Sequence, residues 1–242
     1  MKGGRSDAMT KLRLLKRREC WAPTARGWLV LTAIFLGLAW CLARSANSFL
    51  CVTRPVAAQV LVVECWLPDF AMAAAVAESQ RGGYKLVVTP GWALPEGWVE
   101  GRFKSGGDFA AANLAALGLH TNVIVPLPSE AVVRDRTYAS ALAVNNWLKT
   151  NDWSRQRAIL GPRTPGVGAS VAAVNVYSLG AHARRTRLLY QKALGRKVKV
   201  GIIACPDPRY DGKRWWASTQ GFREVMDEAI AYLYARLLFH PN

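Results

Sequence analysis

The chain has few of the residues that build metal centres and disulfide frameworks. Its 242 residues include three histidines and five cysteines. No two cysteines form a C-x-x-C pair and no Cys/His group has metal-ligand spacing, so we expect no metal site. The odd number of cysteines cannot all pair within one chain. We therefore expect no obligatory disulfide framework, although Cys51, Cys65 and Cys205 would be open to oxidation outside the cytoplasm.

Motifs for binding nucleic acids and nucleotides are missing as well. The sequence has no zinc-finger spacing, no RNP motif and no helix-turn-helix signature, so we expect no nucleic-acid partner. A two-glycine stretch at 166–169 lacks the Lys-Ser/Thr of the P-loop and the third glycine of the dinucleotide-binding fingerprint. We interpret this stretch as an ordinary loop.

Acidic residues are half as common as basic ones, with 16 Asp and Glu against 32 Lys and Arg. The imbalance is greatest at the start, where nine basic residues up to Arg44 face only Asp7 and Glu19. A strongly basic surface attracts anionic lipid headgroups or phosphorylated substrates. Hydrophobic residues make up 51% of the chain, which is enough for a folded core.

Charge is absent from residues 27–43, a run of 17 residues at the short limit for a membrane-spanning helix. Six basic residues precede this run from residue 11 onward, and only Arg44 follows it closely. The positive-inside rule predicts a single-pass anchor in the inner membrane, with a cytoplasmic N-terminus and a periplasmic or extracytoplasmic main domain. The alternative is a cleaved signal peptide with a weak site at 43–45. The long basic lead, with Trp28 and Trp40, favours a retained anchor.

After residue 58, apolar runs alternate with helical segments. This alternation predicts a Rossmann-like, doubly wound α/β domain with a mostly parallel sheet, preceded by one transmembrane helix. The predicted organisation is a basic cytoplasmic tail at 1–26, the anchor at 27–44, a linker at 45–57 and the α/β domain at 58–242. The predicted strands are 59–65, 84–89, 121–125, 171–179 and 198–204, with irregular segments at 90–101 and 151–168. The predicted helices are 69–81, 107–117, 136–150, 182–194 and 219–238, the last with Phe222, Val225, Met226, Ala229, Ile230, Leu233 and Leu237 on one face.

Four landmarks occur in order within residues 59–204. They are an apolar strand entering a polar loop (61–66), a strand ending in Thr-Pro-Gly (87–91), a Thr-Tyr helix start (135–141), and a strand followed by His182-x-x-Arg185. This set, behind an N-terminal anchor, resembles the YdcF-like family, bacterial envelope proteins that include SanA and ElyC. The chain departs from the family pattern after the first strand, where 64–68 replaces a glycine-rich turn. The resemblance implies a ligand site at the strand ends, a link to cell-wall or lipid-carrier metabolism, and S-adenosylmethionine as a candidate ligand.

The residues at the predicted strand ends suggest an anion site. Because the carboxyl ends of parallel strands meet at one edge of a sheet, Glu64, Thr89, Arg136, Thr137 and His182 are predicted to converge. His182 is the candidate general acid or base, with Glu64 or Asp135 as the group that orients it. The predicted ligand-binding residues are Thr89, Gly91, Arg136, Thr137, Arg184 and Arg185.

Each of these interpretations has a structural alternative. The basic helix start after His182 can be a solvated face, and Arg136 and Arg185 can simply pair with Asp135 and Asp108. Asp108 itself is better explained as a helix cap. Cys65 is better explained as a buried thiol, because it has no basic neighbour to activate it.

Two classes of function fit these features. The leading hypothesis is a membrane-anchored envelope enzyme, a hydrolase or transferase, acting on a phosphorylated or lipid-linked intermediate. The alternative is a binding protein without turnover, either a ligand-binding or scaffold module of the envelope or a protein that binds S-adenosylmethionine or a nucleotide. The residues themselves specify no cofactor.

Overall fold

The computed structural model describes residues 23–94, 102–132, 134–149 and 173–241. The chain divides after Leu42 into two units, and the second unit contains the α/β domain. Helix α1 (Ala25–Leu50) is long and apolar enough to cross a membrane. Because α1 continues to Leu50, the first part of the predicted linker is helical. The basic tail before residue 23 and the predicted irregular segment at 151–168 lie outside the described residues, as does most of the one at 90–101.

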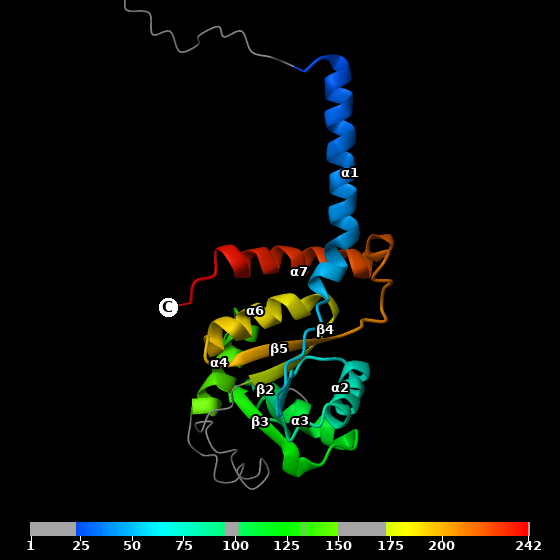
Figure 1. Ribbon diagram of the computed structural model, residues 1–242. Coiled ribbons are helices and arrows are strands. Elements are labelled where there is room, and N and C mark those ends of the chain that lie inside the picture. The colour runs from blue at the N-terminus through cyan, green and yellow to red at the C-terminus, as the bar shows by residue number, and fades with distance from the viewer. Residues whose placement is uncertain (1–22, 95–101, 133, 150–172, 242) are drawn as a thin grey trace, which may run out of the picture. The chain divides into compact units, whose positions relative to one another are not determined.

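In the described residues, five strands form one sheet in the order β3-β2-β1-β4-β5 (Figure 1). All four pairings between neighbouring strands are parallel. The predicted Rossmann-like α/β fold is therefore confirmed. The strand order reverses between β1 and β4, which makes this junction the topological switch point where such sheets bind ligands. The strands are β1 (Val60–Val63), β2 (Leu86–Trp92), β3 (Ile124–Ser129), β4 (Ala173–Leu179) and β5 (Lys199–Cys205).

Helices cover both faces of the sheet, which explains why the central strands are apolar without alternation. Helices α2 (Asp69–Arg81) and α3 (Gly106–Ala116) pack on one face. Helices α4 (Arg136–Lys149) and α6 (Ala183–Leu194) pack on the other. Helix α7 (Thr219–Leu237) lies against α6, outside this second layer (Figure 1).

Two strands extend beyond their predicted ends at residues 89 and 125, and each continues through proline. Strand β2 runs through Pro90 to Trp92, and β3 contains both Pro126 and Pro128. Strand β3 lies at the edge of the sheet, where alternate backbone N–H groups have no neighbouring strand to bond. Pro126 and Pro128 lie two residues apart and therefore face the same side of the strand, so both can take positions where no N–H group is needed. The predicted end of this strand at Val125 is therefore wrong.

Close packing at the end of β2 depends on a glycine. A Cβ atom on Gly107 would lie 2.4 Å from the carbonyl oxygen of Thr89, and the Thr89 hydroxyl donates to the Gly107 carbonyl at 2.9 Å. We predict that Gly107→Ala lowers the free energy of unfolding by about 1–3 kcal/mol, as overpacking does in other cores. Urea unfolding in detergent micelles would measure this change. The reverse replacement at an exposed site of the same helix, Ala116→Gly, calibrates helix propensity alone, and an unchanged stability for Gly107→Ala would contradict the prediction.

Candidate functional site

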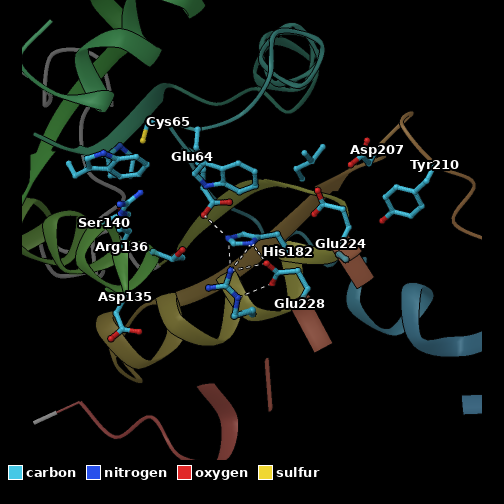
Figure 2. A pocket seen from close by; sticks show the side chains of 17 residues that line it. Glu64, Cys65, Asp135, Arg136, Ser140, His182, Asp207, Tyr210, Glu224 and Glu228 are labelled. Atoms are coloured by element: carbon cyan, nitrogen blue, oxygen red, sulfur yellow. Dashed lines mark hydrogen bonds and ion pairs between the residues drawn. The ribbon is translucent and has the colours of Figure 1, made fainter. Parts of the chain in front are cut away.

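A cavity of about 480 Å³ opens at the carboxyl ends of β1 and β4, at the switch point of the sheet (Figure 2). Glu64 directly follows β1, and His182 ends the short turn Gly180–His182 that follows β4. Gly180 makes this turn with a φ of 47°, a conformation that favours glycine. The cavity is lined by Glu64, Cys65, Trp66, Pro90, Trp92, Asp135, Arg136, Thr137, Ser140, Leu179, Ala181, His182, Arg185, Asp207, Tyr210, Glu224 and Glu228.

The ring of His182 is held by a carboxylate from α7. Its Nδ1 lies 2.7 Å from Oε1 of Glu228, and the edge of Trp66 packs against the ring at a centroid distance of 4.7 Å. Arg185, one helical turn beyond His182, donates to both oxygens of Glu228 at 2.8 and 2.9 Å. The three side chains form a fixed unit, which we call the His182–Glu228–Arg185 cluster.

Electrostatics in this cluster keep Glu228 ionised. Burial by itself would raise the pKa of Glu228, but hydrogen bonds from Arg185 and His182 outweigh burial and lower the pKa to about 2. An ionised carboxylate only accepts hydrogen bonds, so Nδ1 of His182 must donate to it. Arg185 Nη2 also lies 2.9 Å from Nδ1, but both groups are then donors and Glu228 is their shared acceptor. The geometry leaves Nε2 as the nitrogen through which the ring can exchange a proton.

Glu64 faces this second nitrogen from a buried position. Its Oε1 lies 3.7 Å from Nε2 of His182 and accepts a hydrogen bond from the Thr186 hydroxyl at 3.3 Å. Its Oε2 is buried and has no hydrogen-bond partner among the described residues. Leaving a buried polar atom unpaired costs free energy, so an atom of this kind at a cavity wall is a candidate ligand contact.

A different wall of the cavity is made by the N-terminus of α4. The Arg136 guanidinium stacks on the ring of Trp92 at 5.0 Å and forms no ion pair with a described residue. Thr137 and Ser140 line the cavity from the next positions of the helix. Asp135, just before α4, has a φ of 56°, an uncommon conformation for a non-glycine residue. A helix N-terminus, together with an arginine that has no ion pair among the described residues, favours an anionic ligand group.

Three of the six predicted ligand-binding residues line the cavity, and three do not. Arg136 and Thr137 line the cavity, and so does Arg185, although its guanidinium is occupied by Glu228. Thr89 does not line the cavity, because its hydroxyl donates to the backbone of α3. Gly91 and Arg184 also lie outside the lining. Gly91 packs so closely against the backbone of α3 that a Cβ atom there would collide with it. Arg184 stacks on Phe49, with 3.8 Å between the guanidinium carbon and the ring centroid.

The structural alternatives also have clear outcomes. Asp108 forms a capping box with Ser105 at the start of α3, as its position suggested. Arg185 pairs with Glu228 rather than with Asp108. Burial and the neighbouring Glu64 raise the pKa of the Cys65 thiol to about 12, which keeps it protonated and unreactive.

Sequence reasoning missed the carboxylates that come from the C-terminal part of the chain. Glu224 and Glu228, four residues apart on α7, and Asp207 after β5 all line the cavity. Their spacing places both glutamates on one face of the helix, next to the buried Val225, and this was the available signal. Asp207 and Glu224 share Arg209, at 2.6 and 3.3 Å, and this pairing lowers the pKa of Asp207 despite its burial.

The lining is consequently more acidic than the predicted anion site. It contains five carboxylate residues and two arginines, and one of those arginines is bound to Glu228. Within the described residues, no group of three His, Cys, Asp or Glu side chains could hold a metal ion. The wall at the start of α4 carries Arg136 beside Asp135, and the wall made by α7 and the end of β5 carries Asp207, Glu224 and Glu228.

Comparison with protein-family models, curated proteins and solved structures found no match for this chain. Its function must therefore be argued from the residues of the cavity.

Proposed function

We propose that the protein is a membrane-anchored member of the YdcF-like family that acts on a phosphorylated or lipid-linked intermediate of the cell envelope. The observation that carries the proposal is the position of His182. One ring nitrogen is fixed by an ionised glutamate, the other faces Glu64, and the ring lines a cavity at the switch point. This is the arrangement of a histidine that exchanges protons with a ligand.

The proposed ligand spans the two walls of the cavity. Its phosphate group binds at the start of α4, where the side chains of Arg136 and Thr137 offer hydrogen-bond donors and the helix N-terminus favours negative charge. Its reacting end lies toward His182. The ring accepts a proton from an attacking water or hydroxyl group as the new O–P bond forms, and the Glu228 carboxylate stabilises the imidazolium. The same proton then passes to the leaving oxygen as the old P–O bond breaks.

The proposed location rests on α1 and the charges around it. A single apolar helix with basic residues before it anchors the chain in the inner membrane, with the α/β domain on the periplasmic or extracytoplasmic side. This location is consistent with the resemblance to envelope proteins.

A second candidate is a binding protein for S-adenosylmethionine, without turnover. The acidic wall favours it, because Asp207, Glu224 and Glu228 suit a ligand with positive charge better than a purely anionic one. The acid–base histidine is then a polar contact and not a proton carrier.

Removing Arg136 is the direct test of the anionic ligand. We expect pyrophosphate and a polyprenyl phosphate to raise the Tm of the full chain in detergent micelles. Arg136→Ala should weaken that binding roughly tenfold or more, because it removes a charge-assisted hydrogen bond. Arg81→Ala is the matched control, since it removes an arginine from an exposed ion pair on α2. Equal binding by the two variants would contradict the proposal, and a Tm increase with S-adenosylmethionine that persists in Arg136→Ala would support the second candidate.

A further inference from the structure

Helix α7 leaves most of its apolar stripe uncovered. Its sequence places seven apolar residues on one predicted face, but in the structure these residues differ in their exposure to solvent. Val225 is fully buried, while Phe222, Ile230 and Leu237 are 50%, 62% and 64% exposed. Met226 and Leu233 are exposed as well, so that the stripe runs at intervals of three and four residues along the whole helix. Of the eleven exposed large hydrophobic residues described after residue 43, seven lie between Phe222 and Leu238.

The uncovered stripe points away from the domain. The inner side of α7 is marked by its buried residues Gly221, Val225 and Ala235, and Glu228 reaches from that side to the cavity. Exposed apolar patches of this extent are uncommon on soluble monomers and usually mark a contact surface. A partner for α7 must therefore be sought outside the domain.

Trp215, just before α7, connects the first residue of the stripe, Phe222, to the second half of α1. The indole N–H of Trp215 donates to the carbonyl of Ala43 at 2.9 Å, and Ala43 is the last residue of the uncharged run at 27–43. Trp215 also stacks on Phe222 with a centroid distance of 6.0 Å. Farther along α7, Tyr232 contacts Phe49 of α1 at 5.6 Å, and Phe49 is itself 47% exposed. These contacts hold α7 and the turn before it against Ala43 and Phe49, which belong to the same unit as α7.

The charges around the stripe suit an anionic surface. Five exposed basic residues lie in the last part of α1, in the loop before Trp215 and along α7, against two exposed acidic residues, Asp211 and Asp227; the basic residues are Arg44, Lys213, Arg214, Arg223 and Arg236. A helix with an apolar face and basic borders binds at the boundary between lipid headgroups and acyl chains. Basic side chains near such a surface add attraction to anionic lipids.

We infer that α7 is a second membrane contact, which lies on the lipid surface with Phe222, Ile230 and Leu237 inserted among the headgroups. The inference depends on α1 spanning a membrane, but not on the proposed activity. It has a structural consequence for the cavity. Glu224 and Glu228 line the cavity from the other side of α7, so the site lies one helix away from the lipid.

Photocrosslinking of the full chain in vesicles of phosphatidylethanolamine and phosphatidylglycerol tests this contact. Benzoylphenylalanine replaces Ile230 in one variant and Leu117 in another. Leu117 is a matched control, because it is 43% exposed and lies at the end of α3, on the opposite face of the sheet. We expect lipid adducts at position 230 in at least fivefold excess over position 117.

Two results would overturn the inference. One is an equal yield of lipid adducts at positions 230 and 117. The other is crosslinking of position 230 to a second copy of the chain, which would make the stripe a protein interface. Both sites are exposed, so a Tm close to that of wild type should confirm that each variant folds. Leu233 carries the same expectation as Ile230 and provides a second position on the stripe.

Discussion

Glu228→Ala is expected to lower the free energy of unfolding by about 3–5 kcal/mol, because it leaves the guanidinium of Arg185 buried without its carboxylate. The Glu228 and Arg185 side chains are only 12% and 20% exposed, so water cannot replace the lost partner fully. Urea unfolding of the full chain in detergent micelles at neutral pH measures the change. Glu78→Ala is the matched control, because Glu78 pairs with an arginine that is 80% exposed, and such a pair contributes about 1 kcal/mol or less.

The same carboxylate should make the stability depend on pH. Folding lowers the pKa of Glu228 from 4.5 to about 2, so its contribution is complete above pH 4.5 and is lost as the pH falls to about 2. The difference between these two pKa values corresponds to about 3 kcal/mol. Glu228→Gln cannot ionise, and its stability should therefore vary less between pH 5 and pH 3 than that of wild type. Parallel pH profiles for the two proteins would contradict the assignment of the ionised carboxylate.

The fold could be predicted from the sequence because its elements have strong local signals. The apolar run at Val60–Val63 is fully buried, as expected for a central parallel strand. Gly82 and Gly118 follow α2 and α3 closely, and helix bounds agree with prediction to within a residue or two. The errors in the strands occur at Thr121–Val123, which form a short 3-10 helix before β3 instead of its first residues, and at Pro90, Pro126 and Pro128, which lie within strands.

The site could be predicted only in part. Glu64 and His182 follow strands, and parallel topology alone brings strand ends together, so their proximity was foreseeable. Glu228 lies 46 residues after His182, on a helix whose position against α6 has no local signature. The contacts of the basic residues after His182 could not be predicted either. Arg184 and Arg185 occur at a helix start, but Phe49 and Glu228, distant in the sequence, take up their guanidinium groups.

The prediction with the largest functional effect concerns His182. If the ring transfers a proton, His182→Ala should lower the rate of phosphate release from pyrophosphate or a polyprenyl diphosphate by roughly 10²–10⁴-fold. Glu228 keeps Arg185 as its partner in this variant, so the fold should persist with a similar Tm. His240→Ala is the matched control, because His240 is exposed and its ring lies within hydrogen-bond distance of a nearby backbone carbonyl, that of Leu238.

Added imidazole separates a proton carrier from a residue that only holds the ligand. Small imidazole can enter the space vacated in His182→Ala and exchange protons there, so it should restore part of the lost rate. That recovery should follow the concentration of the neutral base as pH changes, because the neutral form accepts the proton. If His182→Ala loses affinity for the ligand and the wild-type protein shows no turnover, His182 is a binding residue instead. The cavity would then belong to a protein that holds its ligand without converting it.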